Sequence, residues 1–135
     1  MTRIKDKMSE IKVFLQELKA IMPKDFDEYK SSLVKKAACE RYVEKIVEAV
    51  TDLAFMIIKA KKLKIPQSDI DAFNILSENK IIDADLVSNL KKAKGMKNII
   101  AHQYGDIDDK VVFDSISHEL ENDVREFIKN VEKVV

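Results

Sequence analysis

The sequence contains very few of the residues that break helices or cross-link a fold. Among its 135 residues are two glycines, two prolines, one cysteine and no tryptophan. This scarcity, with 46% hydrophobic and 36% charged residues, favours long helices over both a disordered chain and an all-β fold. The single cysteine, Cys39, excludes an internal disulfide framework and a cysteine-rich zinc site. We expect Cys39 to be a small core residue and not a nucleophile.

The chain also lacks net charge and long apolar runs. Lys and Arg together number 24, as do Asp and Glu, so contact with nucleic acid would need a local basic patch. No stretch approaches the roughly 18 consecutive apolar residues of a membrane span. We therefore expect one cytoplasmic domain, residues 1–135, that does not contact a membrane.

Apolar residues recur at three- and four-residue spacing along most of the chain, which predicts amphipathic helices. We expect an all-α, antiparallel bundle of about five helices. The apolar side of the second helix is predicted to include Leu33 and Ala37, and that of the fourth to include Ile99 and Ile100. The expected helices are one ending before Pro23, one from Asp27 to Leu63, one capped by Ser68 or Asp69, one capped by Asp83 and one capped by Asp108 or Asp109.

The stretch from Gly95 to Asp108 has the densest set of polar functional groups beside an apolar run. On a helix, Asn98 and His102 are four residues apart and share a face, and we expect Lys97 on the same flank. A cation, an amide and an imidazole at a helix end can hold a phosphate and move a proton. The alternative is that Lys and His complement the dipole of a helix C-terminus. Spacing alone leaves both open.

Further positive charge lies near this stretch. Lys91, Lys92, Lys94 and Lys97 fall within seven residues that contain no acid, which makes the run a candidate contact for a phosphate backbone, with Lys94 in support. Arg41 adds charge to the same site if its helix faces His102. The alternative for these cations is a solvated face or local ion pairs.

The central stretch resembles the HEPN superfamily, in which an Arg and a polar residue are followed by a His five positions after the Arg. It is most similar to the HepT branch, where His-x-Tyr precedes an Asp-rich turn. The corresponding residues here are Lys97-Asn98, His102-Gln103-Tyr104 and Gly105-Asp106-Ile107-Asp108. The likeness extends over nearly the whole chain and includes the Glu40-Arg41 pair.

The resemblance implies a homodimeric toxin of a toxin–antitoxin pair that cleaves RNA without a metal or other cofactor. Its implied partner is a minimal nucleotidyltransferase antitoxin of the MntA type that adenylylates Tyr104. His102 would be the general acid or base, and Asn98 would help to position phosphate. Lys97 stands where the family has Arg, which keeps the charge but loses the two-pronged grip on phosphate. Whether the chain is an active enzyme therefore stays open.

Elementary chemistry agrees with a dimer. RNA cleavage needs a proton acceptor, a proton donor and cations at the phosphate, and one His102 per chain fills only one proton-transfer role. A two-fold dimer supplies a second copy. Two other classes remain open, a non-catalytic helical dimer that binds the nucleotidyltransferase or a nucleotide, and a structural adaptor. Two distant histidines and no cysteine pairs make a zinc site improbable, and a carboxylate metal centre is only weakly supported.

Overall fold

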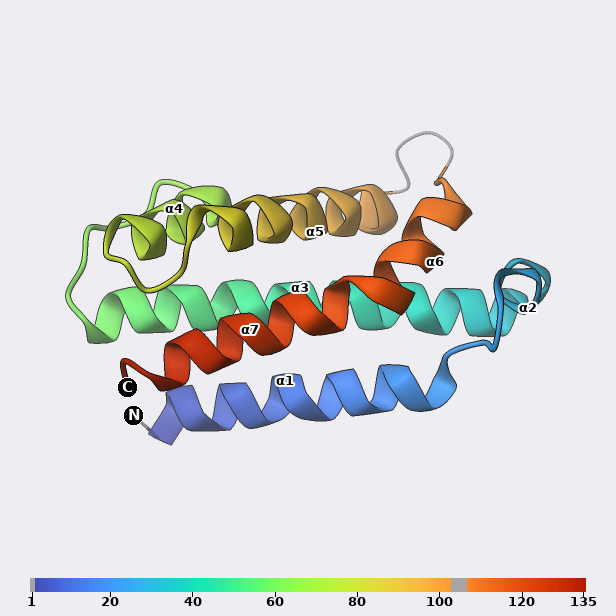
Figure 1. Cartoon of the computed structure of the whole chain (residues 1–135), viewed down its shortest axis with the longest axis horizontal. Coiled ribbons are helices and arrows are strands. Elements are labelled where there is room, and N and C mark those ends of the chain that lie inside the picture. Colours follow the sequence, from blue (N-terminus) through green and yellow to red (C-terminus); the bar gives the residue numbers. More distant parts are fainter. Residues whose placement is uncertain (1, 103–106) are drawn as a thin grey trace.

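The computed structural model describes residues 2–102 and 107–135, and these residues form seven helices without a strand. Four long helices run alternately up and down side by side, while α4 packs at one end and α2 and α6 at the other (Figure 1). The all-helical fold class is confirmed, but the expected count of five is too low. The helices are α1 (Thr2–Ile21), α2 (Phe26–Ser31), α3 (Leu33–Ala60), α4 (Asp69–Glu78), α5 (Ala84–His102), α6 (Asp109–His118) and α7 (Leu120–Glu132).

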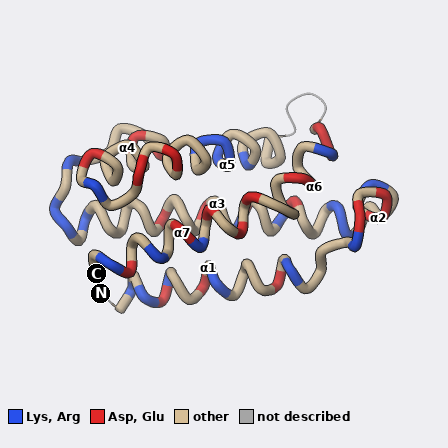
Figure 2. The backbone as a smooth tube through the Cα atoms, viewed as in Figure 1, with Lys and Arg blue, Asp and Glu red and all other residues tan. Residues whose placement is uncertain are grey.

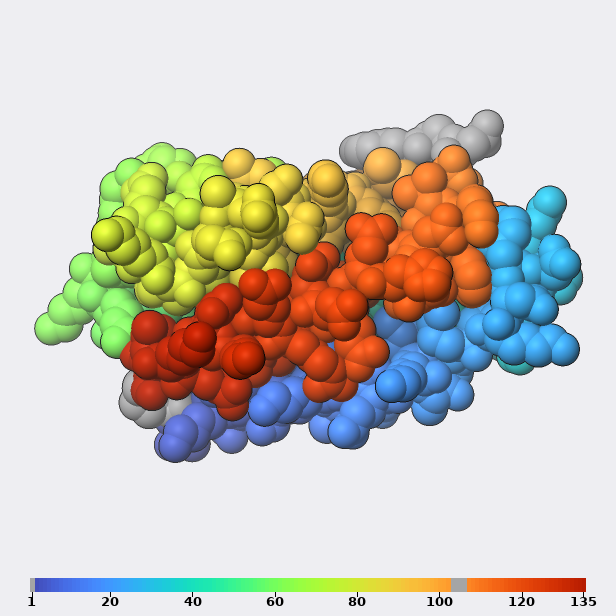
Figure 3. All heavy atoms as spheres, in the orientation of Figure 1, coloured from blue at the N-terminus to red at the C-terminus, as the bar shows by residue number. Residues whose placement is uncertain are grey.

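The central helix of the bundle is α3, which packs against α1, α4 and α5. Its buried side contains Cys39, Val43, Ile46 and Val50, at spacings of four, three and four residues. On the near face in Figure 3, α7 lies between α1 and the layer of α4 and α5. No helix within the described ranges is long and apolar enough to cross a membrane.

The prediction of a single helix from Asp27 to Leu63 is wrong at Ser32. This residue has extended backbone (φ −102°, ψ 102°), and its hydroxyl accepts a hydrogen bond from the Lys35 N–H at 3.2 Å. Serine is a favoured N-cap because its oxygen satisfies a backbone donor that the first helical turn leaves unpaired. The chain therefore stops α2 and starts α3 without a glycine or proline.

This break also changes which residues of α3 face the core. Leu33 is 79% exposed and Ala37 is also exposed, so the prediction that they line the apolar side is wrong. At 3.6 residues per turn, Ala37 lies about 160° from Cys39, whereas Leu33 lies only about 80° from Val43 and is exposed as the first residue of α3. A second break, at Glu119, divides the predicted last helix into α6 and α7, although its apolar seam is buried on both sides of the break.

Several predicted helix starts are confirmed by their hydrogen bonds. Ser68 caps α4 through the Asp71 N–H at 3.0 Å, and Asp83 accepts from the Leu86 N–H at 2.8 Å at the start of α5. Asp108 caps α6 by accepting from the N–H groups of Lys110 and Val111. The first helix ends at Ile21, before Pro23, as expected.

The last turns of α5 contain two neighbouring isoleucines in opposite environments. Ile100 is 4% exposed and Ile99 is 44% exposed, so only Ile100 faces the core. We expect Ile100→Ala to lower the free energy of unfolding by about 2–5 kcal/mol through the cavity it leaves. The same change at Ile99 is the control and should cost less than about 1 kcal/mol. Denaturant unfolding of both variants measures this, and equal losses would contradict the orientation of α5.

Candidate functional site

The predicted site lies on the last two turns of α5, where Asn98 and His102 occupy successive turns on one side. Asn98 is half-buried, and His102, the last residue of the helix, is exposed. Because four residues advance a helix by about one turn, the amide and the imidazole share a face. An imidazole at this end also interacts favourably with the helix dipole when it is protonated. The two chemical groups predicted to act together are thus on one side of α5.

Lys97 lies elsewhere on the helix than expected. It is four residues after Ala93 and three before Ile100, both of which are buried, and it is itself half-buried. Five residues correspond to a rotation of about 140°, so Lys97 and His102 leave α5 in different directions. The expectation of one shared flank is therefore wrong. A lysine in a core-facing register reaches solvent by extending its aliphatic stem along apolar neighbours.

The basic run around Lys97 is partly neutralised. The Lys94 ammonium lies 2.6 Å from the Asp69 carboxylate of α4, and the Lys94 side chain is mostly buried. Lys92 is exposed on another side of the helix, near Asp123 of α7. Figure 2 shows the basic residues of α5 grouped along the middle and second half of the helix. Lys94 therefore serves the packing of α4 on α5, and this counts against its proposed support of phosphate binding.

Arg41 lies on the exposed side of α3. Its guanidinium is 3.6 Å from the Glu44 carboxylate, one helical turn away. The His102 end of α5 lies over the half of α3 that contains Arg41 (Figure 1). The two helices pack on each other, so the positive charge of Arg41 and the end of α5 belong to the same part of the molecule. Tyr104, the predicted modification site, lies outside the described residues.

Sequence reasoning missed a second group of polar residues in this part of the fold. The Lys36 ammonium of α3 lies 2.9 Å from the carboxylate of Asp109, the first residue of α6. Asp109 was expected only as an alternative helix cap. Glu40, one turn after Lys36, and Tyr29 of α2 complete the group. The only local signal was the four-residue spacing of Lys36 and Glu40, since Asp109 is 73 residues away in the chain.

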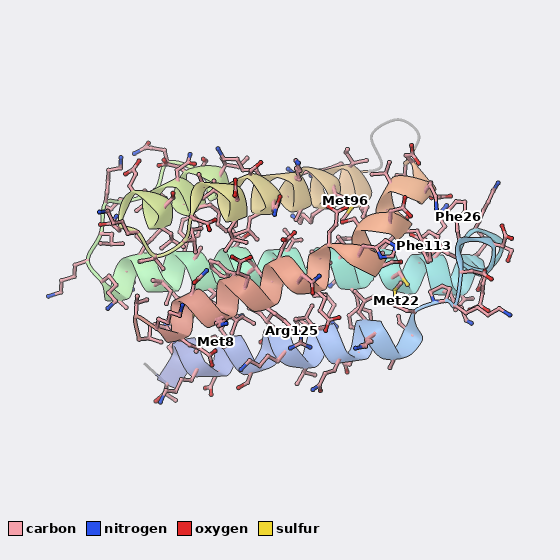
Figure 4. The ribbon with its side chains drawn as sticks, viewed as in Figure 1. Met8, Met22, Phe26, Met96, Phe113 and Arg125 are labelled. Atoms are coloured by element: carbon pink, nitrogen blue, oxygen red, sulfur yellow. The ribbon has the colours of Figure 1, made fainter. Side chains whose placement is uncertain are left out.

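A cavity of about 520 Å³ lies apart from the predicted site, where α1, α2 and α6 meet. Figure 4 shows Met22, Phe26 and Phe113 gathered there. The Lys110 ammonium is 5.0 Å from the centre of the Phe26 ring, and it pairs with Asp114 at 3.1 Å. Of the predicted site residues that the structure describes, none lines this cavity. Its aromatic wall is already covered by a cation, so it does not present a bare face for stacking a base.

The single cysteine has the environment of a core residue. Cys39 is fully buried, and burial raises the pKa of its thiol to about 11, with a smaller contribution from the nearby Glu40 carboxylate. A thiol with a raised pKa is a poor nucleophile because little thiolate is present at neutral pH. The prediction that Cys39 is structural is consistent with both observations.

The fold and the site together define an all-helical domain with a candidate acid–base group at the end of one helix. A family model described as "Ribonuclease HepT-like" matches residues 11–131, and the chain belongs to this family. The mRNA nuclease HepT of Shewanella oneidensis is 37% identical over 86 residues, which are 64% of this chain and 64% of that protein. The tRNA nuclease HepT of Aphanizomenon flos-aquae is 29% identical over 108 residues, 80% of this chain and 74% of that protein. The first of these matches thus spans less than two thirds of the relative's length.

Solved structures show the same likeness in three dimensions. The tri-AMPylated HEPN toxin of Shewanella oneidensis, in complex with its MNT antitoxin, superposes with a TM-score of 0.89 at 29% identity and 96% coverage of both chains. A toxin–antitoxin complex with AMP-PNP gives 0.87 at 29% identity, covering 95% of this chain and 96% of the other. The cytosolic protein YutE of Bacillus subtilis, 17% identical with a TM-score of 0.82, shares the fold.

Proposed function

We propose that this chain is a metal-independent endoribonuclease toxin that acts as a homodimer, and that adenylylation of Tyr104 by a minimal nucleotidyltransferase inhibits it. The observation that carries the proposal is the end of α5, where Asn98 and His102 share one side in a member of the HepT-like family. Relatives named as mRNA and tRNA nucleases support RNA as the substrate. The AMPylated toxin bound to its antitoxin supports the partner and the modification.

In this mechanism His102 moves protons while its neighbours hold the phosphate. A neutral imidazole accepts the proton of the ribose 2′-OH, and an imidazolium donates one to the leaving 5′-oxygen. The Asn98 amide donates to a phosphate oxygen, and the Lys97 ammonium balances the charge that develops there. One His102 serves one of the two proton transfers at a time, so two copies facing a shared groove complete the chemistry.

The surface of α3 offers an interface for such a dimer. Leu33 is 79% and Val34 is 81% exposed, and both belong to the half of α3 that the His102 end of α5 overlies. Neighbouring exposed apolar residues of this size are typical of protein–protein contacts. In a two-fold dimer the same patch faces its own copy, so it would bring the two α5 ends toward one groove.

The dimer is tested by placing a charge in this patch. We expect the parent to be a dimer at micromolar concentration, and Leu33→Glu together with Val34→Glu to make it a monomer, because like charges would face each other across the axis. Ile65→Glu is the matched control, since Ile65 is 80% exposed on the α3–α4 connection and lies outside the patch. Light scattering measures both. A monomeric parent, or a double variant that stays dimeric, contradicts the interface.

The catalytic assignment is tested by exchanging His102. We expect His102→Ala to lower RNA cleavage by about 10²–10⁴-fold with little loss of stability, because an exposed helix-end imidazole buries little surface. The control is His118→Ala, which removes the other histidine, exposed at the end of α6, and should cleave like the parent. Lys97→Arg should leave cleavage equal or raise it, because a guanidinium grips phosphate with two hydrogen bonds. The assay is run with and without a metal chelator. Parent-like cleavage by His102→Ala would refute the role of His102.

Adenylylation of Tyr104 would inhibit cleavage through charge and occupancy. The added AMP brings a phosphate and a bulky base close in sequence to His102 and Lys97. Its negative charge repels RNA phosphate and competes for the same cations.

Mass spectrometry after incubation with the nucleotidyltransferase, ATP and magnesium tests the modification. We expect added AMP mass on the parent, none on Tyr104→Phe, and parent-like addition on the control Tyr42→Phe, whose ring is half-buried on α3. The modified parent should lose RNA cleavage. AMP that persists on Tyr104→Phe would assign the modification to another residue.

One observation favours a second candidate, a non-catalytic binding partner of the nucleotidyltransferase. Lys97 stands where the family has an arginine, and an ammonium lacks the two-pronged grip of a guanidinium on phosphate. A parent that is adenylylated but never cleaves RNA would establish this alternative.

A further inference from the structure

Four polar side chains from three helices meet where α6 begins, and we call them the α6 anchor: Tyr29 of α2, Lys36 and Glu40 of α3, and Asp109 of α6. One Asp109 oxygen accepts a hydrogen bond from the Lys36 ammonium at 2.9 Å. Among the described residues, the other Asp109 oxygen, one Glu40 oxygen and the Tyr29 hydroxyl are buried without a hydrogen-bond partner. Three orphaned polar atoms in one place require an explanation, because each unsatisfied buried group costs free energy.

The charges of the α6 anchor are unbalanced if both carboxyl groups are ionised, since one ammonium then faces two carboxylates. Burial raises the pKa of Glu40; Lys36 opposes the rise, and Asp109 and Glu44 add to it. Burial is the main cause of the raised pKa of Tyr29. The nearby Glu40, Cys39 and Asp109 add to it. Lys36 pairs with Asp109, and because the pKa of Glu40 is raised, its carboxyl group keeps its proton to a higher pH than a free glutamate does.

When Glu40 is protonated, the three orphaned atoms include hydrogen-bond donors as well as an acceptor. A protonated carboxyl group and a phenol are both donors, and the second oxygen of Asp109 is an acceptor. One buried water joining these three atoms would satisfy them all, which is the usual role of water in a polar interior. The centre of the Tyr29 ring lies 5.3 Å from the centre of the Phe113 ring of α6, so aromatic packing also holds α2 against α6.

The position of the α6 anchor connects it with the proposed site. Asp109 directly follows Asp108, the N-cap of α6, and the chain between α5 and α6 leads from His102 to this residue. Glu40 directly precedes Arg41, and Lys36 directly precedes Ala37 of the exposed side of α3. Figures 1 and 3 show α6 (orange) at the end of the molecule where α2 and the first half of α3 lie.

We propose that Lys36, Glu40 and Asp109 are positioning residues for the proposed ribonuclease, in which the ion pair of Lys36 with Asp109, beside the buried Glu40 carboxyl group, holds the first turn of α6 on α3. This contact fixes the position of the first turn of α6 relative to the end of α5 and to Arg41. The inference rests on the proposed function for its effect on catalysis, and on the geometry of the α6 anchor alone for its effect on α6.

The first test replaces Lys36 by Met and measures both catalysis and local stability. Lys36→Met leaves Asp109 buried without its cation, so amide hydrogen exchange in the first turns of α6 should accelerate, and kcat should fall about tenfold with KM nearly unchanged. The double variant Lys36→Met with Asp109→Asn removes both charges and should recover most of each loss. The control is Lys12→Met, which removes the 3.5 Å ion pair between α1 and α7 and should change neither readout.

The second test replaces Glu40 by Gln, which has the shape and neutrality of the protonated acid. Below pH 4.5, where Glu40 is protonated in the parent, this variant should match the parent in stability and in the exchange rates of α6. Because the pKa of Glu40 is raised in the fold, its protonation stabilises the parent fully below the ordinary value of 4.5, and this stabilisation is lost as the pH rises through the raised value. The free energy of unfolding of the parent, relative to Glu40→Gln, should therefore fall as pH increases.

The outcomes separate the parts of the proposal. Unchanged exchange of α6 in Lys36→Met overturns the α6 anchor, and faster exchange with an unchanged kcat overturns its positioning role. A free energy of unfolding of the parent that does not fall with pH relative to Glu40→Gln overturns the role of Glu40 in the α6 anchor. A parent that never cleaves RNA overturns the proposed function and the positioning role with it, while the exchange rates still decide whether the anchor holds α6.

Discussion

The burial of one side of α3 against α1, α4 and α5 is the contact on which the placement of the site depends. A helix of 28 residues with one apolar side has one way to face three neighbours, so the opposite side is left in solvent. That exposed side contains Leu33, Ala37 and Arg41. The packing that stabilises the bundle thus also selects which surface is left for the proposed second subunit and the proposed RNA substrate.

The last turns of α5 contribute side chains both to the core and to the candidate site. Ala93 and Ile100 keep its inner side in the bundle, while Asn98 and His102 face outward. Lys97 stands in the core-facing register between them. A lysine tolerates this position because its flexible apolar stem packs and only its compact ammonium needs water. An arginine carries a wider planar group that requires several hydrogen bonds. The exchange in this chain therefore changes how the charged group is packed and how it grips phosphate, while the direction in which the side chain leaves α5 is the same.

Local patterns predicted most of the fold, and interactions between distant residues were beyond them. Apolar spacing and capping residues located four helix starts or ends, namely the end of α1 before Pro23 and the starts at Ser68, Asp83 and Asp108. Ser32 was missed because a serine inside a helix-forming stretch is a weak local signal, and its capping role depends on the turn made by α2. The ion pair of Lys36 with Asp109 joins residues 73 apart, which no periodicity encodes. The face shared by Asn98 and His102 was predictable from their spacing of four residues. The ion pair of Lys94 was not, because its partner Asp69 belongs to another helix.

The charge balance of the molecule gives a physical reason for the proposed dimer beyond the count of histidines. With 24 basic and 24 acidic residues, the chain has no net attraction for a polyanion. Lys94 is neutralised by Asp69, Lys36 by Asp109, and Arg41 is close to Glu44, so one subunit offers few uncompensated cations around α5. Each phosphate contact contributes to affinity through the release of counterions, and too few contacts give weak binding at physiological salt. Two copies of α5 that face one groove double the number of cations there, while the net charge of the dimer stays at zero. The positive charge is then concentrated at the place where His102 would act.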